Sequence, residues 1–309
     1  MKKRILLYYK YVNVSSPEDI KQWQLALCQS LNLTGRILLA TEGINGTVSG
    51  SLEETEQYIT AMNNHELFGG MDFKDSIVNA QYEYFTKLQV SVKPEIVHLG
   101  IAPEELSSKD GGTHLTPEQA HKLMEENPEN LVLLDGRNYY EARVGTFKNA
   151  ITPKVDHFRE FPEYIDQNID QFKDKQVLMF CTGGIRCERA SAYLKLKDVA
   201  KEVYQIEGGI HRYVEQYPDG FFRGKNYVFD ARITVPVNAD ILGTCDLCET
   251  SCDDYTNCRN AKCNKHFIGC PSCVEKLNNT CSKECLDLVT QALVPIRPYR
   301  PKVDASVQE

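Results

Sequence analysis

One stretch of this 309-residue sequence constrains its fold more than any other: an apolar run, a glycine turn and a helix-forming segment follow one another directly. Residues 176–180 (QVLMF) predict a buried strand of a parallel sheet, because the run is continuously apolar. Residues 188–194 have helical composition, with small side chains suited to close packing. Cys181 lies between the two, at the carboxyl end of the strand, which is where α/β proteins place reactive groups.

The loop from Cys181 to Cys187 (CTGGIRC) has the composition of an anion-binding turn. Gly183 and Gly184 lack a Cβ atom, so the backbone can turn sharply and direct several N–H groups inward. The helix N-terminus and the guanidinium of Arg186 add positive charge. A thiol at the centre should therefore have a depressed pKa and be a thiolate near neutral pH. The alternative is an inert buried cysteine, but the glycines, the arginine and the strand–helix context together favour a reactive one.

This loop resembles the rhodanese active loop, in which a cysteine comes first and an arginine follows five positions later. A related phosphatase loop is one residue longer and makes a wider cradle, so the spacing here predicts sulfur-type chemistry and argues against phosphatase activity. We expect Cys181 and Arg186 to be catalytic and their neighbours to support them, namely Thr182, Gly183, Gly184, Ile185 and Cys187. Two roles stay open for Cys187: resolving a persulfide or sulfenate on Cys181, or packing in the first helical turn.

The twelve cysteines are unevenly distributed along the chain. Three lie in the first 244 residues, and the other nine fall between Cys245 and Cys285. In an intracellular chain such a cluster indicates metal binding more often than disulfides. Eight of the nine form four closely spaced pairs, which are Cys245 and Cys248, Cys258 and Cys263, Cys270 and Cys273, and Cys281 and Cys285.

Short spacing lets one backbone turn supply two thiolate ligands, each about 2.3 Å from the metal ion. Eight thiolates would complete two closed tetrahedral sites, so we expect structural zinc that folds a segment too polar to bury a core of its own. The order in which the pairs combine stays open, as do the roles of Cys252 and of His266, which could replace a cysteine ligand. The alternative is a metal-free set of reduced thiols packed on the central domain.

Composition and charge bound the class of protein. A content of 42% hydrophobic and 25% charged residues is typical of a soluble globular chain. No apolar run approaches the roughly 20 residues that span a membrane, and the apolar N-terminal segment is too short and too aromatic for a signal peptide. We therefore expect a cytoplasmic protein without a membrane partner. A net charge of −8 does not indicate nucleic-acid binding, although an acidic chain can carry a local basic patch.

The sequence predicts an α/β protein with an N-terminal ferredoxin-like (acylphosphatase-like) α+β sandwich. In that unit we expect strands at 5–12 and 36–40, a turn at 42–46 with a return strand at 47–49, and strands at 72–79 and 85–92. Helices should begin after Ser16 and Ser51. No acylphosphatase active loop is present, so we expect binding or scaffolding from this unit. The expected domains are residues 1–95 for the sandwich, 96–113 for a linker, 114–225 for a rhodanese-like domain, 226–290 for a cysteine-rich zinc module and 291–309 for a mobile basic tail.

The central domain carries further matches to the rhodanese pattern. A helix should begin at Thr116, and residues 131–135 and 203–207 predict two more buried strands. The segment Asp135-Gly136-Arg137, followed by Glu141, Gly145 and Ala150, matches the first half of a rhodanese domain. We expect Asp135 and Arg137 to form an ion pair that braces neighbouring loops rather than to act in catalysis directly.

Three segments together carry a more specific resemblance. Residues 41–47 (TEGINGT), residues 181–188 (CTGGIRCE) and the stretch from Asn257 to Cys273 resemble the rhodanese-containing tRNA uridine hydroxylase family, in the same order and over nearly the whole chain. The resemblance implies an oxygen-dependent enzyme that makes 5-hydroxyuridine at the tRNA wobble position. It implies the anticodon loop as partner, molecular oxygen as co-substrate and Cys181 as the essential cysteine.

The residues constrain how such chemistry can run. There is no His-x-Asp/Glu pattern and no dinucleotide-binding glycine fingerprint, so we expect no nucleotide or flavin cofactor. Our hypothesis is that the Cys181 thiolate, or its persulfide, attacks C6 of uracil and makes C5 electron-rich enough to meet oxygen, with loop N–H groups and Arg186 stabilising the developing charge. Two other functions compete: a sulfurtransferase carrying sulfur as a Cys181 persulfide, and a non-enzymatic adaptor, against which the intact Cys181 and Arg186 argue.

Overall fold

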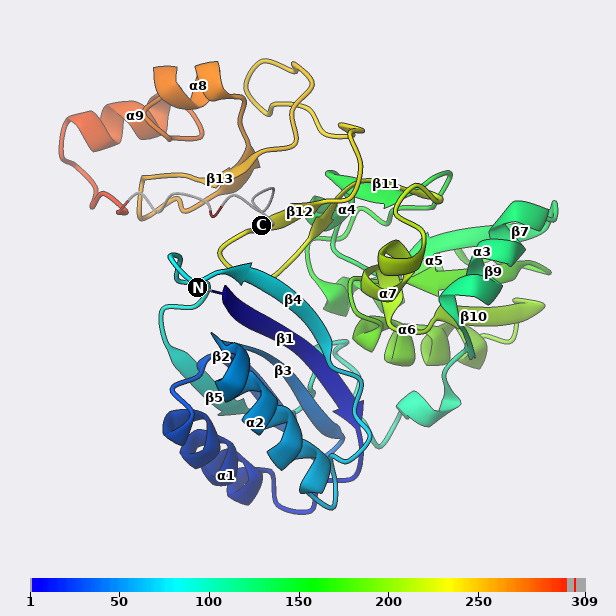
Figure 1. Cartoon of the computed structure of the whole chain (residues 1–309). Coiled ribbons are helices and arrows are strands. Elements are labelled where there is room, and N and C mark those ends of the chain that lie inside the picture. The colour runs from blue at the N-terminus through cyan, green and yellow to red at the C-terminus, as the bar shows by residue number, and fades with distance from the viewer. Residues whose placement is uncertain (1, 299–302, 304–309) are drawn as a thin grey trace.

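The computed structural model describes residues 2–298 and 303, which form an N-terminal unit, a central unit and a cysteine-rich unit (Figure 1). The N-terminal sheet lies beside the central unit, and the cysteine-rich unit follows the last strands of the central one. Within the described residues, no helix combines the length and apolar character needed to cross a membrane.

The N-terminal unit is a five-stranded sheet with two helices packed on one face (Figure 1). The strand order is β4-β1-β3-β2-β5, in which β5 runs parallel to β2 and the other neighbours are antiparallel. Its first four strands have the ferredoxin-like order, as the sequence predicts. The elements are β1 (Lys2–Tyr11), α1 (Pro17–Ser30), β2 (Thr34–Ala40), β3 (Gly43–Ser51), α2 (Leu52–Asn64), β4 (Lys74–Asn79) and β5 (Leu88–Val92).

Local signals explain the helix starts in this unit. Ser51 caps α2 with a full capping box: its side chain accepts from Glu54 N at 3.1 Å, while its own N–H donates to Glu54 at 2.7 Å. Ser16 occupies the N-cap of α1 and Pro17 begins the helix, but the Ser16 side chain makes no cap hydrogen bond. Both predicted helix starts are therefore correct, and only the second has the full cap.

The predicted hairpin is present, but its turn is shorter than the expected 42–46. The turn lies at Thr41 and Glu42, and β3 already begins at Gly43 and pairs with both β1 and β2. The glycines here serve close packing rather than a turn. A Cβ atom on Gly43 would lie 2.1 Å from Lys10 O, and one on Gly46 would lie 2.3 Å from the Tyr8 ring. Strands β4 and β5 are also shorter than expected, since they begin at Lys74 and Leu88.

The central unit contains a four-stranded parallel sheet in the order β6-β10-β9-β7, which confirms the predicted parallel sheet. One hydrophobic cluster lies on each face, the first around α5 and α6 and the second around α3 and α7. The elements are η1 (Ser108–Asp110), β6 (Thr113–Leu115), α3 (Pro117–Glu126), β7 (Leu131–Asp135), α4 (Tyr139–Ala142), β8 (Gly145–Phe147), η2 (Phe158–Glu160), α5 (Phe161–Gln167), η3 (Ile169–Gln171), β9 (Gln176–Phe180), α6 (Ile185–Leu196), β10 (Glu202–Ile206) and α7 (Gly209–Gln216).

The segment predicted as a linker, residues 96–113, packs against the central unit. Leu99 and Leu106 are buried in the cluster around α5 and α6. Gly112 donates its N–H to Ser191 Oγ at 2.7 Å, directly before β6 joins the sheet beside β10. The segment therefore holds the two units together by burial as well as by chain connection.

The C-terminal part begins with β11 (Phe222–Tyr227) and β12 (Thr234–Pro236), which form an antiparallel sheet with β8. The cysteine-rich unit then contains β13 (Tyr255–Asn257), β14 (His266–Ile268), α8 (Pro271–Lys276) and α9 (Lys283–Thr290). Part of the tail predicted to be mobile is hydrogen-bonded to this unit: Ala261 N donates to Pro295 O at 3.0 Å, and Arg297 N to Arg259 O at 2.8 Å. Within that tail, Val303 is buried, and residues 299–302 and 304–309 lie outside the described residues.

Candidate active site and metal sites

The loop after β9 surrounds the sulfur of Cys181 with hydrogen-bond donors. Gly184 has φ +102°, and a Cβ atom there would lie 2.7 Å from the Tyr9 hydroxyl, so the position requires glycine. Its N–H donates to Cys181 Sγ at 3.2 Å. Burial opposes ionisation of Cys181, but the hydrogen bond from the Cys187 thiol, the charge of Arg186, and the N–H groups of Arg186 and Cys187 outweigh it and lower the pKa of Cys181 to about 6.

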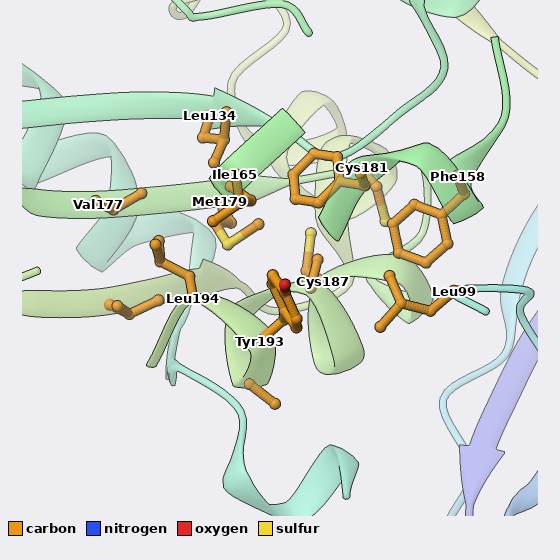
Figure 2. Close-up of a cluster of buried hydrophobic side chains, with 14 of the residues drawn as sticks. Leu99, Leu134, Phe158, Ile165, Val177, Met179, Cys181, Cys187, Tyr193 and Leu194 are labelled. Carbon is orange, nitrogen blue, oxygen red and sulfur yellow. The ribbon is translucent and has the colours of Figure 1, made fainter. Parts of the chain in front are cut away.

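The sulfur of Cys181 is covered in this conformation. Cys181 is 0% exposed and belongs to the same cluster as Cys187, Leu99 and Phe158. Figure 2 shows its side chain directed toward the side of the cluster that Phe158 and Leu99 form. The amides face the sulfur, so the anion-stabilising cradle is present, while the side chains around it leave the sulfur no contact with solvent.

Arg186 is engaged by a buried carboxylate. Its Nη2 donates to Glu141 Oε2 at 2.8 Å, and its Nη1 donates to the other carboxylate oxygen. Burial disfavours the charged guanidinium, yet the charge and hydrogen bonds of Glu141 raise the pKa of Arg186 above its usual range. Glu141 also accepts from Asn138 N at 3.1 Å, which fixes the carboxylate at the start of α4. Sequence reasoning matched Glu141 to a pattern without assigning it this partner, which lies 45 residues away.

Asp135 and Arg137 form a fully buried pair at the end of β7. Arg137 donates to Asp135 through Nε at 2.9 Å and Nη2 at 2.7 Å. Arg137 Nη2 also donates to Gly145 O at 2.6 Å, and Thr146 Oγ1 donates to Asp135 at 2.9 Å. The pair thus joins the end of β7 to β8, which is the geometry of a brace between neighbouring loops.

The N-terminal sheet contacts the active loop through β1, a relationship that the sequence analysis missed. Tyr9 donates to Glu188 at 2.9 Å, and Tyr11 donates to Ile185 O at 3.3 Å. A Cβ atom on Gly183 would lie 3.1 Å from Leu7. The sequence contained a signal for this contact. Leu6 and Tyr8 of β1 face the helices of the N-terminal unit, and the alternating residues 7, 9 and 11, on the opposite face of the strand, are equally bulky. A strand that is apolar or aromatic on both faces is covered on both.

Glu188 connects this contact to the surface. It is buried on α6 and accepts from Tyr9, from Gln205 at 3.1 Å and from His114, whose Nε2 lies 3.0 Å away. The hydrogen bond to Glu188 raises the pKa of His114. Three elements from two units therefore meet at one carboxylate, one residue beyond Cys187.

A cleft of about 790 Å³ opens between β4 and the side of the central unit that α7, β11 and β12 form. Ile77, His211 and Asn226 are among its lining residues. One lining residue of the cleft contacts the active loop: the backbone N–H of His211 donates to Thr182 O at 3.0 Å. Cys181 does not line this cleft, so it is no direct route to the sulfur.

The eight predicted cysteine ligands lie in two groups of four. The ligand atoms of each group all lie within 4.8 Å of one another; the groups are Cys245, Cys248, Cys270 and Cys273, and Cys258, Cys263, Cys281 and Cys285. The sulfur–sulfur distances are 3.6 Å between Cys248 and Cys270, 3.6 Å between Cys263 and Cys281, and 3.9 Å between Cys281 and Cys285. A tetrahedron of thiolates about 2.3 Å from an ion has edges of about 3.8 Å, so the groups fit a tetrahedral metal ion.

The grouping indicates how the cysteine pairs, whose order the sequence left open, would combine around metal ions. The first cysteine pair joins the third and the second joins the fourth, so the two groups interleave along the chain. Cys252 and His266 lie outside both groups. His266 instead lies 3.2 Å from the Tyr227 hydroxyl and 3.1 Å from Asn257 Oδ1, and its ring stacks on Tyr255.

Comparisons with known proteins cover almost the whole chain. Family models match in succession: the UPF0176 acylphosphatase like domain at residues 3–96, the rhodanese-like domain at 116–216 and the rhodanase C-terminal family at 223–286. A protein of Corynebacterium urealyticum named tRNA uridine(34) hydroxylase is 44% identical over 91% of this chain and 96% of its own length. Proteins of the same name from Cytophaga hutchinsonii and Bacillus mycoides are 42% and 40% identical, each over 91% of this chain and over 89% and 88% of their own. Because such relatives match the chain from its N-terminal sheet through its cysteine-rich unit, it belongs to the tRNA uridine(34) hydroxylase family.

Proposed function

We propose that this protein hydroxylates the wobble uridine of tRNA, uridine 34, to 5-hydroxyuridine, acting in the cytoplasm with molecular oxygen as co-substrate. The names of its relatives support the substrate and the reaction. One structural observation carries the chemistry: a cysteine whose thiolate is stabilised by N–H groups of a tight loop and whose pKa is lowered to about 6. Such a sulfur is ionised, and therefore nucleophilic, at neutral pH.

In the proposed reaction the Cys181 thiolate, or its persulfide, adds to C6 of the uracil ring. Addition at C6 places electron density on C5, which attacks molecular oxygen and forms a C5 hydroperoxide. A thiol reductant supplies the two electrons that cleave the O–O bond, so that one oxygen atom stays on C5 as the hydroxyl group and the other leaves as water. Loss of the C5 proton and departure of the sulfur from C6 then restore the C5–C6 double bond and free Cys181. The N–H groups facing the sulfur support this role, because they lie where negative charge is exchanged between sulfur and base. Arg186 contributes charge to the loop while its N–H groups are held by Glu141, so we assign it to the electrostatics of the loop.

Reaction requires the target base outside a stack and the cover over Cys181 displaced. An anticodon loop supplies unstacked bases, which is the form in which proteins read RNA sequence. The cover consists of Phe158 in η2 and Leu99 in the segment between the units. Tyr9 and Tyr11 of the N-terminal sheet contact the loop on another side. We infer that RNA binding displaces the cover while the sheet keeps the loop in shape.

The test is a reconstituted reaction. The full-length protein is incubated with unmodified tRNA and a thiol reductant, in air and under argon, and the nucleosides are analysed by mass spectrometry. We expect uridine 34 to gain one oxygen atom only in air and only with Cys181 intact. A Cys181→Ser protein that still hydroxylates the tRNA would defeat the proposal. Nucleoside analysis of tRNA from cells that lack the gene gives the same test in the cell.

A second function, sulfur transfer through a Cys181 persulfide, is favoured by the match of residues 116–216 to the rhodanese-like domain and by the same thiolate. Incubation with thiosulfate separates the two. A sulfurtransferase gains a sulfur atom on the peptide that contains Cys181 and leaves uridine 34 unchanged. A hydroxylase changes the RNA.

We further propose that the two cysteine groups hold structural zinc. Each group offers four thiolates and no open position, so a bound ion would hold segments together and would not meet substrate. Metal analysis of the purified protein tests this assignment.

A further inference from the structure

One phenylalanine beside the active loop is left on the surface. Phe229 is 56% exposed, although most large apolar side chains near the loop are buried. Its ring lies over the guanidinium of Arg186, with 5.9 Å between Arg186 Cζ and the ring centroid. The rings of Phe229 and Tyr227 also meet in an edge-to-face arrangement, with their centroids 5.4 Å apart. An aromatic ring therefore remains accessible next to the arginine whose charge lowers the pKa of Cys181.

An ion pair and a backbone hydrogen bond close the loop that carries Phe229. Arg232 donates to Asp230 through Nε at 2.8 Å and Nη2 at 2.6 Å, and both side chains are almost fully buried. Val228 N donates to Ile233 O at 2.8 Å, which closes the loop at its base. Ile233 has φ +65°, a conformation that costs energy in a β-branched residue and persists only where surrounding contacts impose it.

Two further contacts fix this loop relative to the reactive centre. Ala231 N donates to Tyr84 O of the N-terminal unit at 3.2 Å. Thr182 Oγ1, next to Cys181, donates to Tyr227 O at 3.4 Å, two residues before Phe229. The backbone on the two sides of Phe229 is thus anchored to the N-terminal unit and to the active loop. Burial does not explain why an apolar side chain stands there.

We infer that Phe229 is a stacking platform for a base of the anticodon loop, and this inference rests on the proposed function. Unpaired bases bind proteins by stacking on aromatic rings, and a ring whose backbone is already anchored loses less entropy when the base arrives. Loss of one such stack weakens RNA binding roughly tenfold to hundredfold. The position beside Arg186 places the stacked base next to the active loop that carries Cys181.

The experiment measures coupling between the ring and individual bases. Full-length wild-type protein, Phe229→Ala and Phe229→Trp are titrated with an anticodon stem–loop RNA, and with versions lacking the base at uridine 34 or at either neighbour. Leu196→Ala is the control, because Leu196 is 67% exposed at the far end of α6. We expect Phe229→Ala to bind the intact RNA roughly tenfold to hundredfold more weakly than the wild type. Phe229→Trp keeps an aromatic ring and should bind as the wild type does, and so should Leu196→Ala.

The decisive observation is the RNA for which wild type and Phe229→Ala bind equally. One abasic RNA should remove the difference, and its position identifies the stacked base. Equal binding of the intact RNA by both proteins overturns the inference, as does a loss that persists unchanged with every abasic RNA. The two proposals fail separately: coupling without hydroxylation by the wild type defeats only the proposed function, whereas hydroxylation without coupling defeats only the stacking role.

Discussion

Arg186 and Glu141 form a two-point ion pair inside the active loop, with Nη2 of the arginine 2.8 Å from Oε2 of the glutamate. Both side chains are buried, so neither charge is screened well by water. The negative charge of Glu141 partly cancels the positive charge of Arg186, so Cys181 experiences only the remaining positive potential. The carboxylate of Glu141 therefore sets how strongly the loop stabilises the thiolate.

Glu141→Gln should make the Cys181 thiolate more stable and the protein less stable. Without the carboxylate charge, the guanidinium of Arg186 is uncompensated, so the pKa of Cys181 should fall below about 6. Removing one partner of a buried ion pair typically costs about 3–5 kcal/mol of unfolding free energy, and the glutamine amide recovers part of that. Urea unfolding measures the loss, and the pH dependence of Cys181 alkylation measures the pKa. Glu163→Gln, at an exposed position in α5, should change neither.

Cys187→Ala should shift the same titration in the opposite direction. In the wild type the thiolate is present above about pH 6 and is lost as the pH falls through that value. The Cys187 thiol stabilises the anion by donating a hydrogen bond, since its own pKa is raised by burial and by the neighbouring Cys181. Without the donor, the midpoint of alkylation of the Cys181 peptide, followed by mass spectrometry, should move up.

Cys187→Ser is the matched variant, because a hydroxyl can still donate. Its midpoint should lie between those of the wild type and the alanine variant. Identical midpoints in all three proteins would show that Cys187 serves packing alone.

Phe158→Ala should expose the reactive sulfur. Phe158 and Leu99 close the cluster on the side toward which the Cys181 side chain points (Figure 2). Truncating a buried phenylalanine costs about 3–5 kcal/mol, and the space it leaves should admit a small alkylating agent. The rate of Cys181 alkylation at a pH well above its pKa should rise. Leu194→Ala, in the same cluster but on the opposite side of Figure 2, is the control for destabilisation alone. Equal acceleration in both variants would mean that access depends on general loosening of the core.

The active loop and the central strands could be predicted from the sequence because their determinants are local. β7 and β9 follow from continuous apolar runs, and the cradle follows from two glycines at a strand–helix junction. The ion pair of Arg186 could not be predicted, since its partner comes from another element 45 residues away. Nor could the cover: nothing in the residues around Phe158 says that they fold over Cys181.

The glycines of β3 show a different limit. A Glu-Gly-Ile-Asn-Gly sequence has the composition of a turn, and turn propensity is a local signal. The structure uses Gly43 and Gly46 inside a strand, where the backbone of β1 and the ring of Tyr8 leave no room for a side chain. A tertiary contact therefore overrides the local preference. The same holds for the segment around Leu99, whose proline and glycine content predicts a linker but whose leucines are buried in the core.

The interleaved grouping of the eight cysteines makes a sharp prediction about metal content. The wild type should bind two zinc ions, one in each group. Cys252→Ser should retain both, because Cys252 lies in neither group.

The Cys245→Ser, Cys270→Ser double variant removes two ligands from one group and should retain one ion. The Cys245→Ser, Cys258→Ser double variant damages both groups and should lose both ions or hold them weakly enough for a chelator to strip them. If instead neighbouring pairs combined along the chain, these two double variants would exchange their results, so metal analysis after chelator treatment decides between the two arrangements. Each group joins two chain segments, and one segment of the other group lies between them in the sequence. Loss of either ion should therefore also loosen α8 and α9 and increase their proteolysis.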